Sequence, residues 1–292
     1  MADFRRQYPF DSHYFEHDGV RMHYLDEGPA DAPVLVMVHG NPTWSFYWRH
    51  LITAFSGAFR VIVPDHIGCG FSDKPQEYTY TLEQHIQNFE ALLAHLGVKD
   101  ITLVVHDWGG GIGFGYATRH PENIQRMVVF NTSAFYRPVV YWGIRLSRSP
   151  IIGDLLTRGL NAFLLGAFFM GTVQHKHFDR EVRQGYLAPY RSWHDRIAIL
   201  RFVQDIPMKA SHPTRRTVNN IEARLHLLKA IPKLIIWGVD DPVFTVDAFL
   251  SGFKLHFPDA EYHELEKSGH FVVEDAHERI IPLMQAFLNK GD

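Results

Sequence analysis

Five short apolar runs rich in valine and isoleucine recur along the chain, and turn-forming residues follow several of them. The runs are Val34–Val38, Arg60–Asp65, Ile101–Val105, Arg126–Phe130 and Lys233–Trp237. Continuous β-branched runs of this length are typical of parallel strands that are buried on both faces. Because helical patterns alternate with these strands, the sequence predicts an α/β protein with a mostly parallel, doubly wound sheet. Functional sites in such sheets lie at the carboxyl ends of the strands.

The clearest predicted helix follows the second run. Thr81 and Gln84 have the spacing of a capping box, and Gly97 is placed to end the helix. Between them, apolar residues recur at helical spacing at Leu82, Ile86, Phe89, Leu92, Leu93 and Leu96. A second helix is predicted at the end of the chain, over Glu278–Leu288.

The alternation of strands and helices stops between about Thr132 and Thr214. Trp, Phe, Leu and Arg recur there without strand punctuation, and glycines interrupt the pattern only at intervals. This predicts a helical cap inserted over the strand ends, so that residues 1–131 and 215–292 form the core and residues 132–214 the cap. The alternative is a longer helical layer of the core itself.

Composition narrows the class of protein. The formal net charge is −3 and no long basic run is present, which argues against nucleic acid as a partner. Cys69 is the only cysteine, so neither an internal disulfide nor a cysteine-based metal site is expected. The first residues lack the apolar segment of a signal peptide, and the most apolar stretch, Pro150–Val173, is interrupted by Asp154 and Arg158. We therefore expect a cytoplasmic protein with no membrane span.

The segment Val105–Gly110 has the pattern of a nucleophile elbow, in which a strand runs through one sharp turn residue into a helix. The turn residue is Asp107. Glycines are dense in the following residues and each costs about 1 kcal/mol of helix stability relative to alanine, so they indicate close backbone packing beside the turn. The alternative is an aspartate that only caps a helix at the end of a strand.

Two later motifs give the chain order nucleophile, acid, histidine, which is the order used by α/β-hydrolases. Gly238–Pro242 follows a predicted strand and contains Asp241, and Lys267–Phe271 contains His270. A neutral histidine can take a proton from water when an acceptor holds its other ring nitrogen, which Asp241 would supply. Asp240 is the alternative acid, although the spacing from the glycine favours Asp241. Considered one at a time, His270 is also consistent with a surface histidine, and Asp241 with an aspartate that only forms a turn.

At these motifs the chain resembles the haloalkane dehalogenases of the α/β-hydrolase fold. The matching segments are His39–Pro42, Pro64–Gly68, His106–Gly109 and Ser268–His270. They extend over nearly the whole predicted core. The resemblance implies an α/β-hydrolase core with an inserted helical cap, and a hydrolase that acts on carbon–halide bonds.

The resemblance also implies a role for each site residue. Asp107 would displace halide from carbon and form an alkyl ester, and His270, oriented by Asp241, would activate water against that ester. Asn41 and Trp108 resemble the donor pair of the family, with side-chain N–H groups for the halide and backbone N–H groups for an oxyanion hole. No cofactor or metal is implied, and the partners would be a small apolar substrate, water and halide. The alternative to these donor roles is that Trp108 is an aromatic residue that only packs in the core and that Asn41 is only a turn residue.

The acid position distinguishes branches of that family. Some dehalogenases have a glutamate after the strand equivalent to Arg126–Phe130, whereas here Asn131–Ser133 contains no carboxylate. Four further segments resemble the third dehalogenase subfamily: Asn41–Arg49, Asp65–Gly70, Tyr186–Tyr190 and Phe202–Pro207. That branch includes β-lactone decarboxylases of long-chain olefin biosynthesis, which share Asp, His, Asn and Trp. The sequence therefore predicts a haloalkane dehalogenase, with β-lactone decarboxylation as the alternative.

Other readings stay open at this point. Epoxide hydrolases also use an aspartate at the elbow, together with acidic cap tyrosines. Four cap tyrosines are candidates for this role: Tyr136, Tyr141, Tyr186 and Tyr190. A hydrolase-fold receptor, with the same residues shaping a ligand pocket, is an alternative of a different class. Four cap aromatics are candidates to line an apolar pocket: Trp142, Phe168, Phe169 and Trp193.

Overall fold

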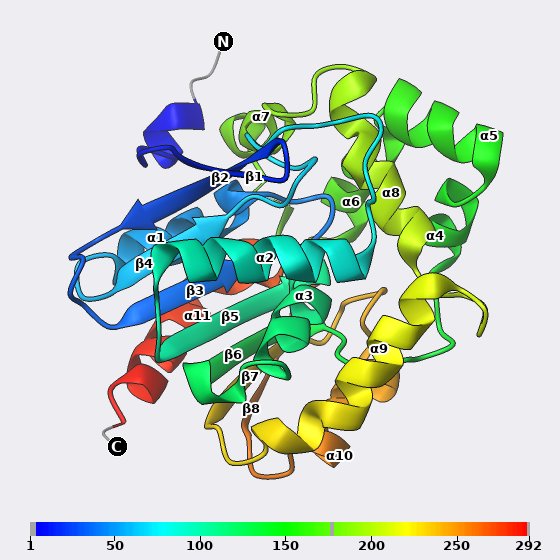
Figure 1. The fold of residues 1–292 in the computed structure, drawn as a ribbon. Helices are drawn as coiled ribbons and strands as arrows, with labels where there is room; N and C mark the ends of the chain where they lie inside the picture. Colours follow the sequence, from blue (N-terminus) through cyan, green and yellow to red (C-terminus); the bar gives the residue numbers. More distant parts are fainter. Residues whose placement is uncertain (1–3, 176–177, 291–292) are drawn as a thin grey trace.

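An eight-stranded sheet in the order β1-β2-β4-β3-β5-β6-β7-β8 forms the centre of the protein (Figure 1). The structure is a computed structural model that describes residues 4–175 and 178–290. The strands are β1 (His13–His17), β2 (Val20–Glu27), β3 (Val34–Val38), β4 (Arg60–Pro64), β5 (Ile101–Asp107), β6 (Ile124–Thr132), β7 (Lys233–Gly238) and β8 (Glu261–Leu265). β1 and β2 pair antiparallel with their neighbours, and β4, β3, β5, β6, β7 and β8 run parallel.

The predicted parallel, doubly wound sheet is confirmed, and all five predicted strands are present. Three strands were not predicted from the apolar pattern: β1, β2 and β8. β1 and β8 are the edges of the sheet, and most of their residues are partly or fully exposed. β2 mixes polar and apolar residues. Such strands lack the continuous apolar run that signals a strand buried on both faces.

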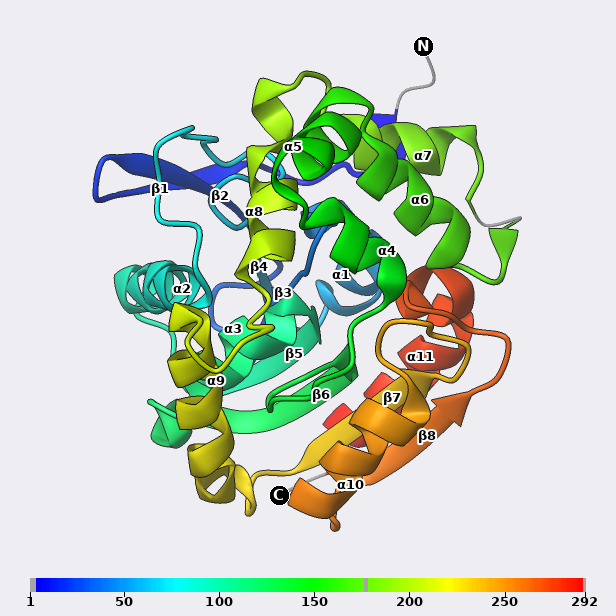
Figure 2. The same cartoon turned by 90° about the vertical axis from the view of Figure 1, so that its right-hand side faces the viewer.

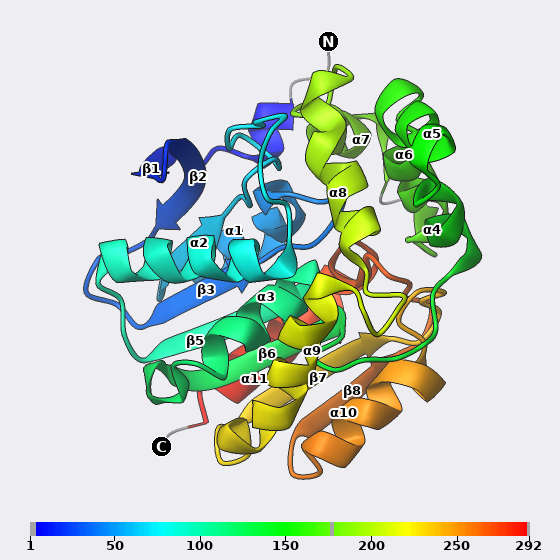
Figure 3. The same ribbon diagram turned by 45° about the vertical axis from the view of Figure 1, so that its right-hand side comes forward.

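Helices cover both faces of the sheet (Figures 1 and 3). They are α1 (Arg49–Phe55), α2 (Leu82–Leu96), α3 (Trp108–Ala117), α4 (Trp142–Ser147), α5 (Pro150–Gly153), α6 (Ala162–Met170), α7 (Arg180–Leu187), α8 (Ile197–Asp205), α9 (Pro213–Arg224), α10 (Ser251–His256) and α11 (Val272–Leu288). α2, α3, α9 and α10 lie on one face, and α1 and α11 on the other. Successive β5 residues alternate between the two cores, since Leu103 and Val105 pack with the first layer and Val104 with the second. This two-sided burial explains why the runs are continuously apolar.

The helix predicted after Thr81 is confirmed as α2. The Thr81 hydroxyl accepts a hydrogen bond from the Gln84 backbone N–H, and Gly97 ends the helix in the left-handed conformation. Only half of the capping box forms, because the Thr81 backbone N–H donates to the Thr79 backbone oxygen rather than to the Gln84 side chain. The predicted closing helix is confirmed as the part of α11 (Val272–Leu288) that follows a kink at Ala276, two residues before the predicted start at Glu278.

Helices α4 to α8 form a separate group over the carboxyl end of the sheet (Figure 2). The division at 131/132 and 214/215 stays a prediction; the second boundary would fall in the first turn of α9, which begins at Pro213. In the described part of the chain, no single helix has the length and apolar composition to cross a membrane. One pair, Pro150–Gly159 and Ala162–Met170, reaches that composition jointly, but it is bent by 74° at its break.

The glycine-rich start of α3 packs directly against β3 and β6. A Cβ atom at Gly109 would lie 2.1 Å from the backbone oxygen of Val38, and one at Gly110 would lie 1.8 Å from Oγ1 of Thr132. The glycines therefore let α3 approach the sheet beside Asp107, as the sequence predicted.

We expect Gly110→Ala to lower the free energy of unfolding by about 1–3 kcal/mol, because the added methyl overpacks a buried contact. Gly57→Ala is the matched control, since its Cβ would meet nothing within 4 Å. Urea unfolding of the two variants measures the difference. Equal stabilities would contradict the close approach.

Candidate active site

Asp107 stands at the junction of β5 and α3 in a backbone conformation that side chains rarely adopt, with φ of 51° and ψ of −127°. This is the sharp strand-to-helix turn expected of a nucleophile elbow. Its backbone oxygen accepts a hydrogen bond from the Thr132 hydroxyl at 2.5 Å, which ties the elbow to the neighbouring strand β6. The turn therefore presents the Asp107 carboxylate at the carboxyl end of the sheet.

A backbone N–H holds one oxygen of that carboxylate. The Asn41 N–H donates to Oδ1 of Asp107 at 2.6 Å. The loop carrying Asn41 comes this close only because residue 40 is glycine, as a Cβ there would lie 2.2 Å from the same oxygen. The loop after β3 and the elbow after β5 thus meet around one carboxylate.

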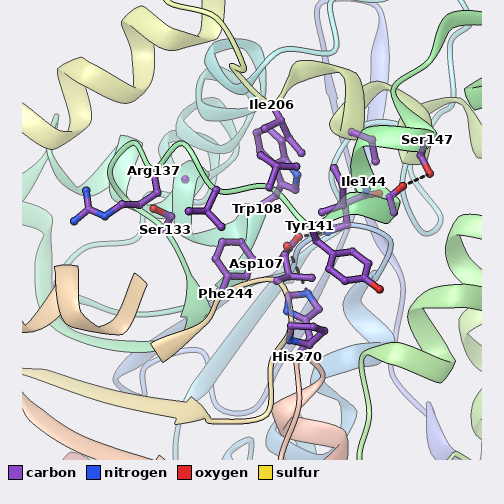
Figure 4. A pocket seen from close by; sticks show the side chains of 18 of the residues that line it. Asp107, Trp108, Ser133, Arg137, Tyr141, Ile144, Ser147, Ile206, Phe244 and His270 are labelled. Carbon is purple, nitrogen blue, oxygen red and sulfur yellow. Dashed lines mark hydrogen bonds and ion pairs between the residues drawn. The ribbon is translucent and has the colours of Figure 1, made fainter. Parts of the chain in front are cut away.

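His270 lies between the carboxylates of Asp107 and Asp241, and Figure 4 shows it beside Asp107. Its Nε2 is 3.6 Å from Oδ2 of Asp107, and its Nδ1 is 2.9 Å from Oδ2 of Asp241. Asp241 is buried, whereas the neighbouring Asp240 is exposed. The structure therefore places the His270 ring between Asp107 and Asp241, and it leaves Asp240 outside this group of three side chains.

Asp241 is fixed by three donors besides the histidine. Its Oδ1 accepts the backbone N–H groups of Val243 and Phe244 at 2.7 and 3.0 Å. Its Oδ2 accepts the Asn131 side-chain amide at 2.9 Å. The same Asn131 side chain also exchanges hydrogen bonds with the backbone of Gly238, at the end of β7.

Asn131 was noted in the sequence only because it is not a carboxylate, and its positioning role was missed. The available signal was its place at the end of β6, between the strands that lead to Asp107 and Asp241. His106 was missed in the same way. Its Nε2 lies 2.8 Å from the backbone oxygen of His270, and this contact helps to position His270.

The charges of the site shift the pKa values of both central groups. Burial raises the pKa of Asp107 above its ordinary 3.8, against the opposing effects of His270 and of the backbone N–H groups of Asn41 and Trp108. Burial lowers the pKa of His270, but the negative charges of Asp241 and Asp107 outweigh it and hold that pKa above 6.5. The imidazolium form is therefore stabilised while both carboxylates are ionised.

The predicted donor pair, Asn41 and Trp108, lines the same cavity as Asp107 and His270. One N–H of the Asn41 side-chain amide donates to the backbone oxygen of Ile199 in the cap, at an N–O distance of 3.2 Å. This bond orients the amide, and its second N–H remains a candidate donor to a leaving group. The Trp108 ring packs against Phe202, with ring centroids 5.2 Å apart. Both residues thus have structural contacts as well as a place beside Asp107.

The cavity above Asp107 has a volume of about 350 Å³ and a mostly apolar lining. Core residues form its base, and cap residues such as Leu156, Phe163 and Ile206 form its walls. Of the four cap aromatics considered from the sequence, Trp142 lines the cavity. The other three do not: Phe168, Phe169 and Trp193. Phe168 is buried in the core, and the side chains of Phe169 and Trp193 are exposed.

Of the four cap tyrosines, Tyr136 and Tyr141 line the cavity, and the other two do not. Tyr186 donates to Glu274 and Tyr190 bonds the loop around Gly70, and neither lines the cavity. Tyr141 does line it, but its hydroxyl donates to Sδ of Met170 and points away from Asp107 in Figure 4. Within residues 4–175 and 178–290, no group of three or more His, Cys, Asp or Glu side chains is arranged to hold a metal ion.

Comparison with known proteins defines the class. A model of the alpha/beta hydrolase fold family matches residues 33–276, and the chain belongs to this family. It is 45% identical to a cis-3-alkyl-4-alkyloxetan-2-one decarboxylase of Shewanella oneidensis, over 97% of this chain and 90% of the relative.

More distant relatives are dehalogenases. The chain is 30% identical to haloalkane dehalogenase 2 of Mycobacterium tuberculosis, over 94% of this chain and 93% of the relative. It superimposes on the crystal structure of a haloalkane dehalogenase from Agrobacterium tumefaciens C58 with a TM-score of 0.85 and 26% identity, covering 96% of each chain. The chain is therefore similar both to β-lactone decarboxylases and to haloalkane dehalogenases.

We expect Asp241→Asn to lower the pKa of His270, because one of the two negative charges that favour the imidazolium is removed. Asp240→Asn is the matched control, since that carboxylate is exposed and outside the group of three side chains. NMR titration of the His270 ring measures both variants. An equal shift in the two would contradict the assignment of Asp241.

Proposed function

We propose that this protein is a β-lactone decarboxylase that converts 3,4-dialkyl oxetan-2-ones into alkenes and carbon dioxide, with Asp107 as the nucleophile. The observation that most directly supports this proposal is the buried Asp107 carboxylate, which is paired with His270 at the base of an apolar cavity. The higher identity to an oxetan-2-one decarboxylase, 45% against 30% for a dehalogenase, supports this substrate class.

In the first step the Asp107 carboxylate attacks C4 of the lactone ring. The C4–O bond breaks, and the ring oxygen leaves as a carboxylate that remains attached to C3. Its negative charge develops in an apolar cavity, where fixed N–H donors stabilise charge far more than they would in water. The side chains of Asn41 and Trp108 are the donors beside Asp107. The product of this step is an alkyl ester on Asp107.

In the second step the new carboxylate loses carbon dioxide. The electrons of the broken C3–carboxylate bond form the double bond, and the C4–O bond to Asp107 breaks, so the Asp107 carboxylate is regenerated. Protonated His270, 3.6 Å away, stabilises this leaving carboxylate. Inversion at C4 followed by anti elimination converts a cis lactone into a cis alkene. Water takes no part in either step.

Haloalkane dehalogenation is the second candidate function, favoured by the placement of His270 between Asp107 and Asp241. Displacement of halide by Asp107 would again form an alkyl ester. Ester formation removes the Asp107 charge, and with it one of the two charges that raise the pKa of His270. With its pKa lowered, His270 would be neutral and could take a proton from the water molecule that attacks the ester carbonyl and releases the alcohol.

Two of the readings drawn from the sequence are not carried forward. Epoxide hydrolysis usually needs two tyrosine hydroxyls aimed at the ring oxygen, whereas only Tyr136 and Tyr141 of the cap tyrosines line the cavity and the Tyr141 hydroxyl is bonded to Met170. The receptor alternative is not carried forward because the relatives at 45% and 30% identity are enzymes. The proposed location stays the cytoplasm, in keeping with the free thiol of Cys69.

Removal of one donor tests leaving-group stabilisation. We expect Trp108→Phe to lower the rate of ester formation by a factor on the order of 10²–10³, because it keeps the ring but deletes the N–H. The matched control is Trp193→Phe, a cap tryptophan outside the cavity. Single-turnover kinetics with a lactone or a bromoalkane measure the step. A change of less than severalfold in Trp108→Phe would move leaving-group stabilisation to other residues.

The two candidate reactions differ in their use of water. We expect the protein to release alkene and carbon dioxide from a cis-dialkyl oxetan-2-one faster than bromide from a 1-bromoalkane. Repeated turnover in oxygen-18 water should leave the mass of Asp107 unchanged with the lactone, because no water attacks the ester. With a haloalkane the Asp107 peptide should gain oxygen-18. No alkene from any lactone, together with bromide release, would replace the first function by the second.

A further inference from the structure

The outer helices of the cap expose large apolar side chains. Six of them define what we call the apolar cap face: Trp142, Ile151, Ile152, Leu155, Leu165 and Phe169. Ile151 is 85% exposed and Phe169 75% exposed. Scattered exposed apolar residues are ordinary, but a contiguous group of this kind marks an interaction surface. Outside the cap, the described residues include three exposed large apolar side chains: Tyr14, Leu227 and Leu255.

The elements that carry these residues pack against one another. The π-helical turn η4 (Asp154–Gly159) contacts α4, α5 and α6, and α4 contacts α5, so these elements form one layer of the cap (Figure 2). A hydrogen bond from Tyr141, the residue before α4, to Sδ of Met170 joins the start of α4 to the end of α6. The apolar cap face therefore belongs to one layer of the structure.

The active-site cavity opens at this layer. Trp142, Leu146 and Met170 line the cavity and are also exposed at the surface. An apolar molecule that enters the cavity there passes between side chains that are themselves apolar. The exposed group is thus continuous with the lining of the site.

Charge indicates what covers the apolar cap face. The segment 139–173 contains Arg145, Arg148 and Arg158 but only one acid, Asp154, although the whole chain has a net charge of −3. Asp154 is already paired with Arg158, and Arg145 is exposed on α4. A symmetric dimer through this face would bring like charges together, because the same patch meets itself. An anionic lipid surface instead attracts arginine beside apolar side chains.

The hydropathy of two cap helices also favours a lipid surface as the partner of the apolar cap face. The pair Pro150–Gly159 and Ala162–Met170 has the apolar composition of a membrane segment, but it is bent by 74°. These helices are short and have one side against the protein, as Leu164 and Phe168 of α6 are buried. A surface of this form suits insertion into the lipid interface, with Trp142 at the level where tryptophan is favoured.

We propose that the apolar cap face docks on an anionic lipid surface, so that apolar substrate enters the cavity directly from the lipid. The docking step requires only the exposed residues and Arg145, and it stands apart from the proposed decarboxylation. The lipid source of the substrate rests on that proposed function, because a dialkyl lactone dissolves in lipid rather than in water.

Vesicle flotation tests the docking without any activity measurement. The full-length protein is mixed with vesicles of phosphatidylcholine alone, or of phosphatidylcholine with a minor share of phosphatidylglycerol. The test variant is the double substitution Ile151→Glu and Phe169→Glu, which touches no residue of the cavity lining. The matched control is Leu255→Glu, since Leu255 is 80% exposed on α10, away from the cap. Circular dichroism and thermal unfolding check that each variant is folded.

We expect the wild-type protein to float with the anionic vesicles and to bind the neutral ones more weakly. The double variant should bind at least about tenfold more weakly, because two apolar side chains no longer insert, and Leu255→Glu should match wild type. Absence of wild-type binding, or equal loss in both variants, would overturn the proposal. Concentration-dependent dimerisation that the double variant abolishes, without vesicle binding, would overturn it in favour of an interface between copies.

Discussion

A buried carboxylate that must stay ionised is the constraint on which this site depends. Burial alone raises the pKa of Asp107, and a neutral acid would be a poor nucleophile. The fold opposes this with the Asn41 backbone N–H at 2.6 Å and with His270, itself paired with Asp241. Each of these contacts comes from a different loop at the carboxyl end of the sheet.

Small residues make these contacts possible. Gly40 lets the loop after β3 touch the carboxylate, and Gly109 and Gly110 let α3 lie against β3 and β6. The strained elbow is held by this packing and by the Thr132 hydroxyl rather than by any preference of aspartate for its backbone conformation. Under the proposed function, one arrangement would serve two chemistries: Asp107 would form an ester, and the substrate would decide whether that ester fragments or is hydrolysed.

The sequence predicted what depends on local pattern. The two-sided burial of β5 required a continuous apolar run, and the order of Asp107, Asp241 and His270 along the chain indicated where the site lies. It could not predict β1 or β8, because edge strands need no such run, nor the positioning role of Asn131. That role exists only because β6 lies between β5 and β7. In the cap, an apolar composition does not tell a residue that faces the cavity from an exposed one such as Phe169.

The central claim is that the Asp107 carboxylate attacks a substrate carbon and forms a covalent ester, the step shared by both candidate reactions. We expect His270→Phe, incubated with a reactive 1-bromoalkane, to gain the mass of one alkyl group, located by peptide mapping at Asp107. The double variant with Asp107→Asn should gain nothing. An adduct on another residue, or bromide release without any adduct, would contradict the account.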